Sequence, residues 1–160
     1  MRLISEKKKR EVIEKLLLQN YNKYYRLAYS YVHNDSDAGD IVQNGAYKAI
    51  FYSYKLKNIE YAETWLYRIM LNEIFANYRE KESVTLDEAN YDQGKEDTYE
   101  NVDLHKAIDM LEKKDRAVVV LRYFEDRKLE DIAEVLQENL STVKSRLYRS
   151  LKKLRLEMEE

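Results

Sequence analysis

The chain has 160 residues, a formal net charge of -2, no cysteine and no proline. This length allows one domain or two small ones, and the lack of cysteine excludes disulfides and thiolate metal sites. Only three glycines are present, and a multi-stranded sheet normally needs more turn residues, so the composition favours an all-helical protein. No apolar run approaches the roughly 20 residues of a membrane span and no signal peptide is visible, so we expect a cytoplasmic protein.

The first half of the chain is expected to begin with two helices. Residues 7–32 form the first, with apolar side chains that can share one face although polar residues 19–20 interrupt it. Segment 34–37 ends this helix and can cap the next one, expected at residues 38–54, because Asp and Ser side chains accept from free backbone N–H groups. The expected core stripe of the first helix comprises Val12, Leu16, Tyr24, Leu27, Ala28 and Tyr31.

A polar loop and a third helix follow. The loop spans residues 55–61, and the helix runs from Thr64 to about Arg79 with a regular apolar stripe. Aromatic and cationic side chains gather on and beside this helix, a combination that suits unstacked bases, because rings stack on bases and cations follow the backbone. Ordinary packing is the alternative, and it is favoured for Trp65, which stands at helical spacing from Ile69.

The composition then changes. Residues 80–102 contain eight acids and two lysines, and their apolar residues follow no period. This composition is typical of a linker between folded modules. We therefore predict an all-α chain of two small helical domains, at residues 1–80 and 103–160, joined by an acidic linker at 81–102.

The second domain is expected to contain a helix-turn-helix. One helix starts near Asp103 and another spans Asp115–Phe124, with Asp115 as its cap. Residues 129–136 then form a short helix, and after a polar break residues 141–155 form the last one. This last helix has no acid and six cations: Lys144, Arg146, Arg149, Lys152, Lys153 and Arg155.

A helical wheel divides the last helix into two faces. The apolar stripe comprises Val143, Leu147, Leu151 and Leu154. The opposite face is polar and cationic, centred on Ser145 and Arg149, and Ser141 or Thr142 can cap the helix. In a helix-turn-helix the N-terminal residues of the second helix meet base edges in the major groove, where Arg and Lys reach guanine edges or phosphates. The pattern therefore predicts a DNA-reading helix.

These features also have alternative interpretations. A solvated basic face is the alternative for the last helix, and the turn Gln137–Asn139 is atypical because a glycine followed by an apolar residue is more usual there. Residues 35–46 match a calcium loop poorly, and the two histidines, His33 and His105, have no metal-ligand spacing. No motif for catalysis, a metal or another cofactor is present, so we expect no enzymatic activity.

Three segments in this order resemble the extracytoplasmic-function (ECF) group of sigma-70 sigma factors. They read Asp-Ala-Gly-Asp-Ile-Val-Gln at 37–43, Thr-Trp-Leu-Tyr-Arg-Ile at 64–69 with Asn72 and Arg79, and Thr-Val-Lys-Ser-Arg-Leu-Tyr-Arg at 142–149. The resemblance covers roughly residues 15–155. It implies a protein that directs core RNA polymerase to a small set of promoters.

The resemblance also implies site residues. In that family the first domain (region 2) binds the clamp helices of the polymerase β′ subunit and melts the promoter −10 element. The second domain (region 4) binds the β flap and reads the −35 element. The implied polymerase contacts are Asp37, Asp40, Ile41, Gln43, Asn44 and Tyr47. The implied −10 contacts are Lys55, Lys57, Asn58, Tyr61, Trp65, Arg68, Asn72 and Arg79. The implied −35 contacts are Ser141, Thr142, Lys144, Ser145, Tyr148, Arg149 and Lys152.

Some residues depart from the family pattern. Gly39 and Asn44 stand where acids are common, and Ala76 replaces a frequent Asp. The family further implies an anti-sigma factor as a partner. Two other classes stay open: a free-standing helix-turn-helix regulator, usually a dimer on a palindrome, and a sigma-like protein that binds polymerase without initiating transcription. Run-off transcription with core polymerase separates the three.

Overall fold

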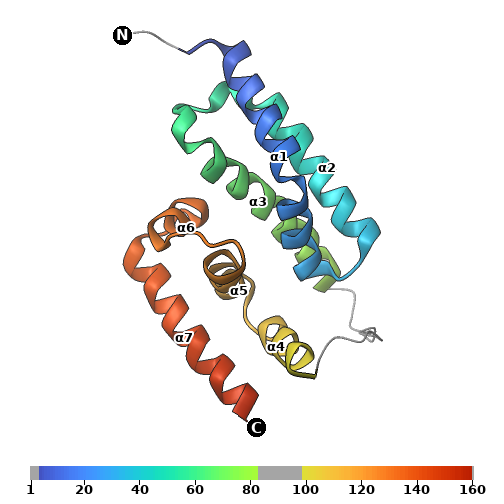
Figure 1. Cartoon of the computed structure of the whole chain (residues 1–160), viewed down its shortest axis with the longest axis vertical. Coiled ribbons are helices and arrows are strands. Elements are labelled where there is room, and N and C mark those ends of the chain that lie inside the picture. The colour runs from blue at the N-terminus through green and yellow to red at the C-terminus, as the bar shows by residue number, and fades with distance from the viewer. Residues whose placement is uncertain (1–3, 83–98, 160) are drawn as a thin grey trace. The chain divides into compact units, whose positions relative to one another are not determined.

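The computed structural model describes residues 4–82 and 99–159, and it contains helices and no strand in these ranges (Figure 1). The chain divides into two compact units, Met1–Val84 and Thr85–Glu160. The prediction of an all-α chain with two helical units is confirmed. The predicted linker at 81–102 falls mostly outside the described residues, and the helices on either side of it reach Glu82 and begin at Tyr99. Within the described ranges, no helix combines the length and hydropathy that a membrane span requires.

The first unit is a packed group of three long helices, with two short 3-10 helices between the second and third. Its elements are α1 (Glu6–Val32), α2 (Asp35–Phe51), η1 (Ser53–Lys55), η2 (Ile59–Tyr61) and α3 (Ala62–Glu82). Each long helix contacts the other two, and α1 and α2 lie side by side (Figure 1). Segment 34–37 contains the cap of α2 as predicted, but the capping side chain is Asn34 rather than Asp or Ser. Its Oδ1 accepts from the backbone N–H of Asp37 at 2.8 Å, and the helix begins at Asp35, earlier than the predicted residue 38.

The core stripe of α1 differs from the predicted one in its first half. Ile13 and Leu17 are buried, whereas Val12 and Leu16 are half-buried. Ile13 and Leu17 lie four residues apart and so share one face of the helix before Asn20, where φ −114° and ψ 19° interrupt the helical geometry. Val12 and Leu16 are rotated away from that face. The stripe was therefore placed one residue too early.

The second unit packs four α-helices. Its elements are α4 (Tyr99–Asp109), α5 (Lys113–Val119), the π-helical turn η3 (Val120–Phe124), α6 (Leu129–Leu136) and α7 (Leu140–Glu159). The last helix contacts α4, α5 and α6, so its orientation is fixed from three sides. The buried apolar residues of this unit include Ile108, Val118, Leu121, Ile132, Val143 and Leu147.

The start of α5 corrects one prediction. The helix begins at Lys113, and its cap is Glu112, whose Oε1 accepts from the backbone N–H of Asp115 at 3.4 Å. Asp115 therefore lies inside the first turn, where its backbone N–H is already satisfied by the preceding glutamate. Its carboxylate is left to bind other side chains.

Candidate nucleic-acid interface

The turn between α6 and α7 has the form of a helix-turn-helix. Gln137 ends α6 in the left-handed conformation, at φ 57° and ψ 44°, where a glycine is more usual. Asn139 caps α7: its Oδ1 accepts from the backbone N–H of Thr142 at 3.1 Å and from the hydroxyls of Ser141 at 3.1 Å and Thr142 at 2.7 Å. The prediction that Ser141 or Thr142 caps the helix is therefore wrong, because both hydroxyls donate to Asn139.

The buried side of α7 corrects the wheel at one position. Val143, Leu147 and Leu154 are buried as predicted, but Leu151 is 36% exposed. Ser150 is fully buried instead. The stripe thus runs at spacings of four, three and four, which follows the helical period more closely than the predicted one.

The opposite side of α7 carries the predicted −35 set. Lys144, Ser145 and Lys152 are exposed, and Tyr148 is 64% exposed. At the start of the helix, Ser141 is exposed and Thr142 half-buried. We call these residues, together with Arg149, the α7 face. The fold brings all seven to one side of a helix whose other side is packed against the unit.

Acids from other elements pair with two arginines of α7, so the helix is less cationic than its own sequence indicates. The guanidinium of Arg146 donates to both carboxylate oxygens of Glu138, at 2.8 and 2.9 Å, to Asp115 at 2.8 Å and to Glu112 at 3.4 Å. Its hydrogen bonds lower the pKa of Glu138, and the bond to Glu138 raises the pKa of Arg146 further above its ordinary value. Arg149 also contacts Asp115, at 3.1 Å. Sequence reasoning missed this network, because the acids lie 8 to 34 residues from the arginines.

The loop between α2 and α3 exposes four of the eight residues predicted to contact the −10 element. Lys55, Lys57 and Asn58 are exposed, and Tyr61 is 56% exposed. The ammonium of Lys55 lies 5.0 Å from the centroid of the Tyr52 ring, which is a cation–π distance. Sequence reasoning did not single out Tyr52, whose ring extends this aromatic and cationic surface.

The predicted −10 residues on α3 differ in their exposure to solvent. Asn72 is exposed, whereas Trp65 and Arg68 are half-buried. Part of each of these two side chains therefore packs within the unit and part faces solvent. The side chain of Arg79 lies outside the described residues.

The exposed side of α2 carries most of the predicted polymerase set. Asp40, Gln43 and Asn44 are exposed, Tyr47 is 70% exposed and Asp37 is half-buried. One correction concerns an apolar residue. Ile41 is only 2% exposed and packs in the core, so its side chain does not belong to the exposed set. Phe51, at the end of the same helix, is 58% exposed and stacks on Tyr47 with ring centroids 6.1 Å apart.

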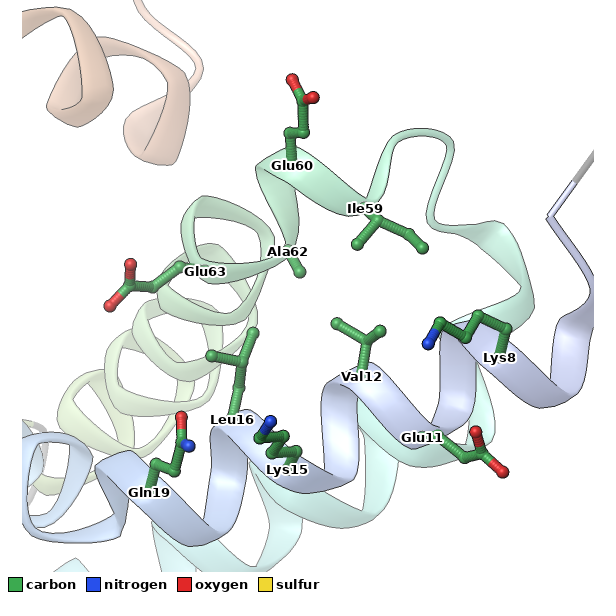
Figure 2. Close-up of a pocket in the computed structure, with 10 residues that line it drawn as sticks. All are labelled: Lys8, Glu11, Val12, Lys15, Leu16, Gln19, Ile59, Glu60, Ala62 and Glu63. Carbon is green, nitrogen blue, oxygen red and sulfur yellow. The ribbon is translucent and has the colours of Figure 1, made fainter.

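A separate open pocket of about 580 Å³ lies between α1 and the η2–α3 junction (Figure 2). Val12, Leu16, Ile59 and Ala62 supply its apolar surface. Its charged residues have both signs, with Lys8, Lys15, Glu11, Glu60 and Glu63 around the apolar ones. Because positive and negative side chains are mixed around it, the pocket does not favour the binding of a polyanion. In the parts of the chain that the structure describes, no group of His, Asp or Glu is placed to hold a metal ion.

Comparison with known proteins identifies both units. Residues 16–84 match the family Sigma-70 region 2, and residues 101–154 match Sigma-70, region 4. The RNA polymerase sigma factor SigV of Bacillus subtilis is 38% identical over 159 residues, which cover 94% of this chain and 96% of SigV. The ECF RNA polymerase sigma factor SigE of Mycolicibacterium smegmatis is 30% identical, and the match covers 89% of this chain and 60% of SigE.

A solved structure shares the fold. The sigma factor RpoE of Bartonella quintana, in complex with the anti-sigma factor NepR, superposes with a TM-score of 0.73 at 22% identity, over 91% of this chain and 96% of RpoE. The two units correspond to regions 2 and 4 of the sigma-70 family. The chain belongs to the ECF group of sigma-70 RNA polymerase sigma factors. It is a transcription initiation factor rather than an enzyme, and its partners are RNA polymerase and promoter DNA.

Proposed function

We propose that the α7 face reads the −35 duplex of the promoters that this sigma factor selects. The observation that carries the proposal is the exposure of Lys144, Ser145, Tyr148 and Lys152 on the second helix of the helix-turn-helix, opposite its buried stripe. The small Ser145 side chain allows the backbone to approach base edges, and the lysines can neutralise phosphates. Region 4 would at the same time dock on the β flap of the polymerase.

The loop 55–61 and the adjoining part of α3 are proposed to hold the melted −10 strand. Exposed Tyr61 offers a ring on which a flipped base can stack, and Lys55 and Lys57 offer charges to the backbone. Asn58 has a local role as well, because its side chain accepts from the backbone N–H of Glu60 at 2.9 Å and so starts η2. Replacement of Asn58 would therefore change the loop as well as any contact to DNA.

The exposed side of α2 is proposed to dock on the β′ clamp helices. Asp40, Gln43, Asn44 and Tyr47 present a polar surface with one large ring. A Cβ at Gly39 would meet nothing within 4 Å, so an acid at this position is sterically allowed. We expect Gly39→Glu, which restores the usual family residue, to strengthen binding to core polymerase in a fluorescence-anisotropy titration.

An anti-sigma factor is proposed as the regulatory partner, because the structurally similar RpoE was crystallised with one. Such a partner would co-purify with the tagged chain from its native cells and would block transcription when added back. The cytoplasm is the proposed place of action, since RNA polymerase and the chromosome meet there.

Run-off transcription tests the function as a whole. The purified chain and core polymerase would be incubated with genomic fragments, and the RNA 5′ ends sequenced to locate the promoters. Specific start sites that need this chain are expected. Arg149→Ala should weaken promoter binding and leave core binding unchanged. Promoter affinity unchanged by Arg149→Ala, measured by gel shift with holoenzyme, would contradict the assignment of the α7 face.

Two control outcomes separate the alternatives. A free-standing regulator would bind duplex DNA tightly without polymerase, as a dimer. A non-initiating sigma-like protein would bind core polymerase and yield no start sites.

A further inference from the structure

One buried carboxylate joins α5 to two arginines of α7. Asp115 is only 2% exposed. Its Oδ1 lies 2.8 Å from Nη1 of Arg146 and 3.1 Å from Nη2 of Arg149, and its Oδ2 lies 3.5 Å from the same Nη2 of Arg149. The backbone of α5 fixes the position of this carboxylate, because the first turn of the helix is packed into the unit.

The two arginines are in different surroundings. Arg146 is 18% exposed and donates to three acids, so its hydrogen-bonding capacity is used within the protein. Arg149 is 50% exposed, and within the described residues its contacts are those of Nη2 with Asp115. A guanidinium has five N–H donors, so the remaining donors of Arg149 can reach a ligand.

We propose that Asp115 is a positioning residue for DNA readout, which fixes the guanidinium of Arg149 so that its remaining donors meet a chosen site on the duplex. The inference rests on the proposed function of the α7 face. An exposed arginine normally samples many rotamers, and ordering it on binding costs entropy. A carboxylate that already holds one edge of the planar guanidinium removes part of this cost and restricts the direction of approach.

The charge of Asp115 has a second effect on binding. A mobile arginine can neutralise any phosphate, and such contacts carry no sequence information. An arginine paired with a buried carboxylate carries less net charge and offers directed donors. Asp115 should therefore favour discrimination between sequences over general affinity for DNA.

The test uses holoenzyme assembled from the full chain and core polymerase. Wild-type holoenzyme would first select a −35 duplex from a random pool, and its affinity for that duplex and for the unselected pool would then be measured at several salt concentrations. For Asp115→Asn we expect the ratio of the two affinities to fall about tenfold. We also expect the salt slope on the unselected pool to steepen by about 0.9, the slope of one added phosphate contact.

Glu112→Gln is the matched control. It removes the same charge from the same network and keeps the Oε1 that caps α5 at the backbone N–H of Asp115, but Glu112 contacts Arg146, at 3.4 Å, and is not in contact with Arg149. Its affinity ratio and salt slope should equal those of the wild type. An unchanged ratio in Asp115→Asn, or an equal loss in Glu112→Gln, would overturn the proposal.

Two further measurements keep the test decisive. If Asp115→Asn does not fold, the side-chain mobility of Arg149 in the free wild-type chain is measured instead, as its ¹⁵Nε order parameter. This order parameter should be higher for Arg149 than for Arg155, which is exposed on the same helix. Equal order parameters for the two arginines would refute positioning by Asp115. The proposed function fails separately: if Arg149→Ala leaves the ratio unchanged, the α7 face is misassigned. If Arg149→Ala lowers the ratio and Asp115→Asn does not, only the positioning role is lost.

Discussion

Gly45 of α2 packs directly against Met70 of α3. A Cβ built on Gly45 would lie 2.6 Å from Sδ of Met70, closer than real Cβ atoms approach, and 3.1 Å from its Cε, which is a tight contact. Met70 is 1% exposed, so its thioether has little room to move. The glycine therefore allows α2 and α3 to approach closely, and it keeps the exposed side of α2 in place above the core.

The first prediction compares the two glycines of α2. Gly45→Leu should lower the free energy of unfolding by about 1–3 kcal/mol, because the added side chain overpacks the contact with Met70. Gly39→Leu, the same substitution in open space, should raise it by about 0.5–1 kcal/mol, because glycine is a poor helix former. Urea unfolding followed by circular dichroism measures both changes. Equal effects at the two positions would show that the contact with Met70 is unimportant.

The second prediction separates the two arginines by stability. Arg146→Met should cost about 3 kcal/mol, because Glu138 is left without its strongest partner and Asp115 loses one of two. Arg149→Met should cost less than about 1 kcal/mol, since Arg149 is half exposed and Asp115 keeps Arg146. Thermal unfolding of the two variants gives the comparison. A greater loss in Arg149→Met would show that the stabilising pair was misidentified.

Local patterns predicted the helices well but not their ends or partners. The span of α6 was predicted as observed, because its apolar residues recur at helical spacing and separate clearly from its polar ones. The cap of α5 was wrong by three positions, since two acids, Glu112 and Asp115, can both serve and only the packed structure selects between them. Ile41 was included in the polymerase set because of its position in the family motif, although its helical spacing of three from Ala38 and four from Gly45 already favoured the core.

The site shows the same limit more clearly. A wheel of the last helix locates the α7 face, because periodicity determines which side is free. It assigns Arg146 and Arg149 to a cationic surface, yet Asp115 and Glu138 neutralise much of their charge. Those acids come from other elements, and a single sequence gives no signal that pairs them with the arginines. The sequence alone therefore locates the α7 face but does not show that acids from other elements neutralise its arginines.

The third prediction concerns the stability of the fold at acidic pH. The hydrogen bond from Arg146 lowers the pKa of folded Glu138 below its ordinary value of 4.5. The unfolded chain therefore binds this proton more readily, so the stabilisation is complete well above pH 4.5 and is lost as pH falls through the lower folded pKa. The free energy by which wild type exceeds Glu138→Gln should thus be largest near pH 7 and shrink in acid. Urea unfolding at a series of pH values measures it.

The control for this titration is Glu14→Gln, because Glu14 is exposed on α1 and lies in the other unit. The free energy of unfolding of Glu14→Gln should differ little from that of the wild type across the pH series. A Glu138→Gln difference that stayed constant, or grew, as pH fell would contradict the assigned ion pair.

The fourth prediction distinguishes phosphate contacts from base readout on α7. Lys152 is exposed on the α7 face, whereas its neighbour Lys153, which is also exposed, is rotated about 100° toward the side of Arg146. Lys152→Ala should weaken binding of holoenzyme to selected and unselected duplexes by the same factor and reduce the salt slope by about 0.9. Lys153→Ala should change neither quantity, because its side chain is directed away from the duplex. Anisotropy titrations at four salt concentrations provide both slopes, and a loss confined to the selected duplex would instead place Lys152 at a base edge.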